Sequence, residues 1–338
     1  MLLEGGSFRR GSAPFRFENM WFKVEGFKDL IRNWWRGIEV SGSASFRLSA
    51  KLKELKQKLK VWNREVFGNL ECNKEAALQQ VEYWDRVEGE RSLIVEELAC
   101  KKEAKEGYAK WVDLEETHWR QVSRELWLKV GDRNTGYFHR MASAHRRANY
   151  MDIIKINGVR LTKEREIKEG VVNAFQQQFS ESSRWRANIG SLHFNQTCLQ
   201  EAEMLELPFT EGEVKAALMD MNGDKAPGPY GFSLFFWQSC WDFVKEEILE
   251  MFKEFYDYNI FLKSLNNTFL VLLPKKGGAE DLGDFRPISL LGGLYKLLAK
   301  VLANRLKKVI GKVVSLDQNA FVTGRQIFRR LSNSKRSD

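Results

Sequence analysis

Apolar side chains recur at alternating steps of four and three residues after Ser45, which is the spacing of one face of an α-helix. This seam ends near Gly68 and consists of Leu48, Leu52, Leu55, Leu59, Trp62 and Val66. A second helical run starts near Leu70 and is interrupted at Gly89, and a third carries Leu98, Trp111, Leu114 and Trp127. The pattern predicts an antiparallel helical hairpin or a small coiled-coil-like bundle over residues 41–130.

Lysines occupy the polar side of the first of these helices, at Lys51, Lys53, Lys56, Lys58 and Lys60. One interpretation is an arm that contacts nucleic acid or a second copy of the chain. The other is a solvated face that keeps a packed helix soluble. Charge runs opposite an apolar seam are usually of the second kind, and the pattern favours it.

Residues 131–200 have a mixed pattern. The segment Asp152–Val159 alternates apolar and polar residues around Asn157-Gly158, which predicts a β-hairpin. Apolar spacing then predicts a helix that contains Ile167, Val171, Ala174, Phe175 and Gln178. Two interpretations stay open for the local cations, which are either a surface cluster or a contact to phosphate beside aromatic rings. The residues are Tyr137, Phe138, His139, Arg140, His145, Arg146 and Arg147.

The last third of the chain predicts helices at 211–221 and 243–256. Between them Pro227, Gly228, Pro229 and Gly231 predict a rigid turn, here called the Pro-Gly turn, within Lys225–Phe232. Two short β-rich runs, Thr268–Pro274 and Phe285–Leu291, flank a Gly-rich charged loop and predict a hairpin with cations at its tip. A helix with an apolar stripe follows from Leu294 to Ile310. The fold class predicted for the whole chain is therefore α+β, with a mainly helical N-terminal region.

Composition narrows the classes of function. The chain has 338 residues, a net charge of +9 and a pI near 9.2, which favours a polyanionic partner. Cys72, Cys100, Cys198 and Cys240 show no Cys-x-x-Cys pair, which predicts reduced, buried thiols rather than zinc or a disulfide framework. The N-terminus lacks a signal-peptide pattern, and the apolar run 290–302 is too short to span a bilayer. We expect an intracellular protein without a membrane partner.

Four sequence blocks in the last third resemble the reverse transcriptase of non-LTR (LINE-type) retrotransposons, most closely those of plants. In chain order they are Lys225–Phe232, Asn267–Lys275, Phe285–Leu290 and Gln318–Arg325. They match a lysine-rich Pro-Gly-Asp-Gly box, an Ile-Pro-Lys strand end, an Arg-Pro-Ile-Ser box and a Gln-x-x-Phe-x-x-Gly-Arg segment. The chain departs from the first box, because Tyr230 stands where the family has Asp.

Upstream segments resemble the same polyprotein. Trp127–Thr135 and Tyr137–Arg140 resemble the linker between endonuclease and polymerase, and Pro14–Trp21 resembles the segment after the endonuclease. The resemblance implies four parts. They are a remnant after the endonuclease at 1–40, which we expect to be irregular or an edge strand, a helical linker at 41–130, a mixed linker at 131–200, and a truncated N-terminal fingers/palm part of the reverse transcriptase at 201–338.

The resemblance also implies binding residues. Arg286, Lys275 and Lys276 match positions that hold the dNTP triphosphate, since paired guanidinium hydrogen bonds suit phosphate oxygens. The template strand would be contacted by Lys225, Gly228, Gly231, Gln318, Gly324 and Arg325. A structural alternative is a surface hairpin in which Arg286 forms an ion pair with Asp281 or Asp284.

The resemblance assigns no catalytic residue and no metal ligand to this chain. In the family, two-metal phosphoryl transfer with magnesium uses aspartate boxes that would fall beyond Asp338. We therefore expect a chain that binds RNA or an RNA/DNA hybrid, with dNTP bound in the complete enzyme, and that does not polymerise alone. The alternatives are a non-catalytic basic nucleic-acid-binding module and a helical protein that self-associates.

Overall fold

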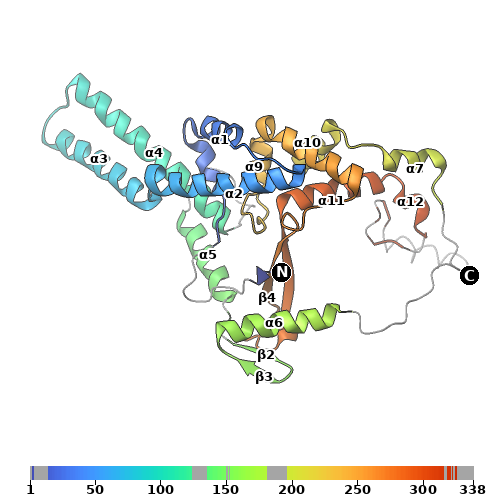
Figure 1. Ribbon diagram of the computed structural model, residues 1–338. Coiled ribbons are helices and arrows are strands. Elements are labelled where there is room, and N and C mark those ends of the chain that lie inside the picture. The colour runs from blue at the N-terminus through green and yellow to red at the C-terminus, as the bar shows by residue number, and fades with distance from the viewer. Residues whose placement is uncertain are drawn as a thin grey trace, which may run out of the picture.

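Figure 1 shows the computed structural model, which describes residues 2–3, 14–123, 135–149, 151, 153–180, 196–315, 318–320, 322 and 324–325. Trp127, Asp152 and the C-terminal tail lie outside the described residues. The helices are α1 (Phe27–Arg36), α2 (Ala44–Trp62), α3 (Leu70–Glu90), α4 (Val95–Ser123), α5 (Thr135–Ala148), α6 (Glu164–Phe179), α7 (Leu199–Glu206), α8 (Glu211–Met219), α9 (Leu234–Ser239), α10 (Trp241–Tyr258), α11 (Gly293–Leu306) and α12 (Ile310–Val313). The strands are β1 (Leu2–Leu3), β2 (Ile154–Ile156), β3 (Val159–Leu161), β4 (Thr268–Pro274) and β5 (Phe285–Leu291).

The fold class is α+β with a mainly helical N-terminal region, which confirms the prediction. One sheet has the order β1-β4-β5, in which β4 and β5 are antiparallel and β1 lies parallel to β4. The predicted hairpin boundaries of β4 and β5 are confirmed. The second sheet is the antiparallel pair β2-β3, whose turn residues Asn157 and Gly158 have φ angles of 51° and 80°, as a two-residue hairpin turn requires.

The apolar seam of α2 faces a large hydrophobic core, as predicted, but one member is wrong. Leu48, Leu52, Leu55 and Leu59 are at most 1% exposed, whereas Val66 is 71% exposed. The chain leaves the α-helix at Trp62 and continues as a π-helix over Asn63–Phe67. Because a π-turn changes the angular step between residues, Phe67 rather than Val66 faces the core.

The expectation of an irregular segment before residue 40 is partly wrong. Leu2–Leu3 do form an edge strand, but a 3-10 helix spans Asn19–Lys23 and α1 follows it. Phe27, Ile31 and Trp35 are buried at four-residue spacing on α1. Three apolar positions separated by charged residues are a short signal, which is why the periodicity was hidden among aromatic and polar neighbours.

Helices α3 and α4 form the predicted antiparallel hairpin, which projects from the body of the molecule in Figure 1. No described residue of α3 is buried. The side chain of Lys101 on α4 is 8% exposed, and its ammonium group pairs with Asp85, at 2.5 Å, and with Glu88 on α3. These bonds raise the pKa of Lys101. Acidic residues outnumber basic ones over 70–123, although the whole chain is basic.

A second hydrophobic core lies at the far end of the β4–β5 hairpin. Ile167, Val171 and Phe175 of α6 pack with β2 residues against the hairpin, which contributes Leu270, Leu272 and Phe285. Figure 1 shows α6 and the β2–β3 sheet beside that end of the strands. Each core combines residues from more than one of the four segments implied by the resemblance, and that division stays a prediction.

A buried arginine connects α11 to α8. The guanidinium group of Arg305 donates to both carboxylate oxygens of Glu213, each at 2.7 Å, and to the backbone carbonyls of Leu205, Leu207 and Pro208. It also lies 4.4 Å from the ring centroid of Phe209. These hydrogen bonds hold the pKa of Glu213 below its usual value. A buried charge is tolerated here because its donors are satisfied.

Among the described helices, none combines the length and apolar character needed to cross a bilayer. All four cysteines are free. Cys240 is buried, and burial raises the pKa of its thiol. The prediction of buried thiols is wrong for Cys72, Cys100 and Cys198, which are exposed.

Replacing Ile154 by Ala should destabilise the second core. Ile154 is fully buried, and deleting its methyl groups leaves a cavity that costs about 2–5 kcal/mol. We expect hydrogen exchange, followed by mass spectrometry, to show loss of protection in β4, β5 and α6 before α2. Val159→Ala is the control, since Val159 is 60% exposed on the adjacent strand. Equal loss of protection in both variants would contradict the assigned core.

Candidate nucleic-acid interface

The tip of the β4–β5 hairpin is closed by hydrogen bonds. Arg286 pairs across the hairpin with Leu273, and Phe285 pairs with Pro274. Lys275 then donates its backbone N–H to the carbonyl of Asp284 at 2.8 Å and its Nζ to the carbonyl of Gly283 at 2.7 Å. These bonds therefore fix the loop that begins with Lys275 and Lys276 and ends next to Arg286.

Arg286 is exposed and forms no ion pair within the part of the chain that the structure describes. Asp284, one acid of the structural alternative, pairs with Lys276 at 2.8 Å, and this bond lowers the pKa of Asp284. The ion pair that the alternative assigned to Arg286 is thus absent from the described contacts, whereas Lys276 is engaged. Of the three predicted dNTP-binding cations, Arg286 is the one left without an intramolecular partner there.

The hairpin tip is supported from the side by β2. The backbone N–H of Lys155 donates to the carbonyl of Glu280 at 2.7 Å, and its ammonium group pairs with the Glu280 carboxylate at 2.7 Å. A bridge between Lys155 and Asp281 continues this contact. Together with the second core, these bonds attach the tip loop to the β2–β3 sheet.

The Pro-Gly turn packs against this chain's own backbone. A Cβ on Gly228 would lie 2.6 Å from the backbone nitrogen of Gly292, between β5 and α11. A Cβ on Gly231, where φ is +84°, would lie 2.2 Å from the carbonyl oxygen of Phe15. Both positions therefore require glycine for internal contact. Their assignment to template binding stays a prediction.

Tyr230, the departure from the family box, is integrated into the fold. Its hydroxyl lies 2.5 Å from the Oγ of Ser49 on α2, and its ring packs against the first core. Tyr230 therefore ties the Pro-Gly turn to α2.

The predicted template residues after α12 contact one another and the helix end. The guanidinium group of Arg325 donates to the carbonyls of Gly311 at 2.8 Å and Gln318 at 2.9 Å, and also to those of Ser315 and Val314. Gln318 Nε2 donates to the carbonyl of Ala320, and Gly324 has a φ of +82°. Arg325 thus satisfies carbonyl groups at the C-terminal end of α12.

The predicted residues fall into separate groups. Lys225 is exposed at the start of the Pro-Gly turn, which touches the Leu291–Gly292 end of the hairpin. Arg286 and Lys275 lie at the opposite end of the same seven-residue strands. With a rise of about 3.3 Å per residue, these ends are about 20 Å apart. The hairpin therefore holds the two groups at a fixed separation.

Contacts within the chain occupy several other predicted cations. Lys51 of α2 pairs with Glu247 at 2.5 Å in a half-buried contact, and Lys58 lies 3.5 Å from Glu54. The ring of His139 on α5 lies 4.6 Å from that of Trp119 on α4. These contacts support the structural interpretation for Lys51, Lys58 and His139.

The sequence places Lys296 on the basic side of α11, but sequence reasoning did not connect it to the Pro-Gly turn. Its Nζ donates to the carbonyl of Ala226, the residue after Lys225, at 3.0 Å. Periodicity places Lys296 outside the apolar stripe of its helix, but it carries no signal for the element that the side chain meets. The Lys225–Phe232 block gives no signal for this contact either.

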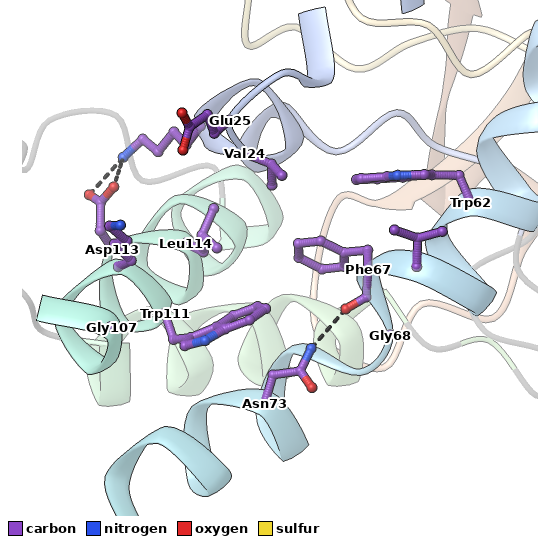
Figure 2. Close-up of a pocket in the computed structure, with 13 residues that line it drawn as sticks. Val24, Glu25, Trp62, Phe67, Gly68, Asn73, Gly107, Trp111, Asp113 and Leu114 are labelled. Atoms are coloured by element: carbon purple, nitrogen blue, oxygen red, sulfur yellow. Dashed lines mark hydrogen bonds and ion pairs between the residues drawn. The ribbon is translucent and has the colours of Figure 1, made fainter. Parts of the chain in front are cut away.

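A cavity of about 730 Å³ lies at the base of the α3–α4 hairpin, away from all predicted site residues. Figure 2 shows Trp62, Phe67 and Trp111 around it. Lys23 and Asp113, which form an ion pair 2.7 Å long, also line the cavity. Asn73 closes one side by donating to the carbonyl of Phe67. No group of three His, Cys, Asp or Glu side chains that could hold a metal ion occurs among the described residues.

Part of the chain is similar to a transposon-encoded protein. The relative is the Transposon TX1 uncharacterized 149 kDa protein of Xenopus laevis, which is 37% identical over 126 residues. The matched segment covers 37% of this chain and 10% of that protein. No protein-family model matches the chain.

Replacing Gly228 by Ala should destabilise the folded protein by about 1–3 kcal/mol, because the added methyl group would overlap backbone atoms that cannot rotate away. Gly277→Ala is the matched control, since nothing lies within 4 Å of its added Cβ. Urea denaturation followed by tryptophan fluorescence measures both. Equal midpoints for the two variants would show that the turn does not pack as described.

Proposed function

We propose that this chain is part of the reverse transcriptase protein of a LINE-type retrotransposon, and that its β4–β5 hairpin belongs to the nucleotide-binding fingers. The observation that carries the proposal is Arg286, an exposed cation without an ion-pair partner in the described structure, on a strand with the boundaries that the motifs predict. The similarity to a transposon protein supports the same origin.

The chemistry of the hairpin suits a triphosphate. A guanidinium group forms two parallel hydrogen bonds to phosphate oxygens, and a strand position fixes its direction better than a loop does. Lys275 and Lys276 add positive charge at the tip, although Lys276 must exchange Asp284 for the ligand. Magnesium would neutralise the phosphates in the complete enzyme. The proposed ligands are dNTP at the tip and an RNA or RNA/DNA strand at the Pro-Gly turn.

Arg286→Ala should weaken dATP binding by about tenfold to a hundredfold, which corresponds to the loss of charge-assisted hydrogen bonds. Isothermal titration calorimetry with dATP and magnesium measures the affinity. Arg64→Ala is the control, because Arg64 is 73% exposed and pairs with the adjacent Glu65. Unchanged dATP affinity in Arg286→Ala, or an equal loss in the control, would refute the fingers assignment.

We further propose that these 338 residues bind without polymerising, because the metal-binding aspartates of the resembled family belong to boxes that the matched blocks do not include. A primer-extension assay with magnesium, dNTPs and a matched template should show no template-dependent incorporation by the purified chain. Incorporation that depends on the template would overturn this part of the proposal.

A second candidate is a basic nucleic-acid-binding module that does not bind nucleotide. It is favoured by Lys225, an exposed cation at the opposite end of the hairpin from Arg286. Binding of an RNA/DNA hybrid that falls steeply with salt, together with no measurable dATP binding, would select this candidate over the first.

A further inference from the structure

Two lysines converge on the Pro-Gly turn. Lys296, in the first turn of α11, reaches the turn and donates one N–H of its ammonium group to the carbonyl of Ala226 at 3.0 Å. Lys225 is the residue immediately before Ala226. An ammonium group has three N–H donors, so Lys296 keeps donors beyond the one that this bond uses.

Neither lysine pairs with an acid in the described structure. Asp224, the nearest acid in sequence, forms no ion pair with either. Lys296 is half-buried, and this burial, followed by the charge of Lys225, lowers its pKa. Two cations held near each other, one of them desolvated, are an unfavourable arrangement that a bound anion would relieve.

The next lysine on α11 behaves differently. Lys300 lies four residues after Lys296, on the same side of the helix, and pairs with Asp220 at 2.7 Å. This pair holds the pKa of Asp220 below its usual value. The α8–α11 contact therefore neutralises Lys300 with an acid of this chain and leaves Lys296 to be neutralised from outside.

We propose that Lys225 and Lys296 together bind one backbone phosphate of a nucleic-acid strand at the Pro-Gly turn. This inference rests on the proposed function and adds Lys296 to its strand-binding surface. A phosphate oxygen accepts hydrogen bonds from both ammonium groups, and such contacts position a strand without reading its sequence. The site lies about 20 Å from Arg286, too far for a nucleotide bound there to supply the same phosphate.

The test measures binding of a fluorescein-labelled RNA/DNA hybrid by fluorescence anisotropy, at salt concentrations between about 50 and 200 mM. Lys296→Met removes the charge and keeps a long, unbranched side chain. Lys296→Gln removes the charge and keeps a donor for the carbonyl of Ala226. Each should weaken binding by about fivefold near physiological salt, the loss expected for one phosphate contact. Lys300→Met is the matched control, because Lys300 already pairs with Asp220, and this variant should bind as the unmodified chain does.

A double variant tests whether the phosphate is shared. If both lysines hold one phosphate, the two changes are coupled, so the affinity lost in Lys225→Met combined with Lys296→Met differs from the product of the two single losses. Independent contacts would multiply the two losses and overturn the shared site. Inorganic phosphate is the second probe. When phosphate replaces chloride at equal ionic strength, the unmodified chain should still bind the hybrid more tightly than Lys296→Met does. Loss of this difference in affinity would show that the two lysines bind free phosphate instead, and would overturn the proposal.

The outcomes separate this inference from the function on which it rests. An unmodified chain that binds the hybrid while both Lys296 variants bind equally well overturns the inference alone. An equal loss in Lys300→Met also overturns it, since the effect would then be one of general charge. An unmodified chain that does not bind the hybrid at low salt overturns this inference together with the proposed strand binding at the Pro-Gly turn, while the dATP titration still tests the hairpin tip.

Discussion

Packing at both ends of the β4–β5 hairpin is the constraint on which the arrangement of the site depends. An isolated two-stranded hairpin is only marginally stable in water. Here Leu270, Leu272 and Phe285 enter the second core, while the opposite end meets the Pro-Gly turn, where Gly228 touches Gly292. If either attachment were lost, Arg286 at one end and Lys225 at the other would no longer be held at a fixed separation.

The net charge of the chain says little about where an anion would bind, because many cations are neutralised internally. Arg305 is enclosed by Glu213 and three carbonyl groups, Lys300 pairs with Asp220, and Lys51 pairs with Glu247. The cations that remain without an acid are the informative ones. The α3–α4 hairpin has an excess of acidic residues, so the net positive charge of the chain comes from other segments.

Local pattern predicted the elements well where one signal was strong. The boundaries of β4 and β5 followed from apolar runs bounded by proline and glycine, and the seam of α2 followed from its period. The π-turn that exposes Val66 has no such signature. Periodicity also identifies an apolar face without identifying its partner, which is why the packing of α6 on the hairpin could not be predicted.

The same limit applies to the candidate site. A glycine-rich block allows close approach either of a ligand or of the chain's own backbone. At Gly228 and Gly231 it is the chain's own backbone that approaches. These two uses are complementary. A turn fixed against Gly292 and Phe15, and bonded through Tyr230 to Ser49, holds Lys225 and the carbonyl that Lys296 meets in one place. Charged groups positioned in advance bind an anion with a smaller entropic cost.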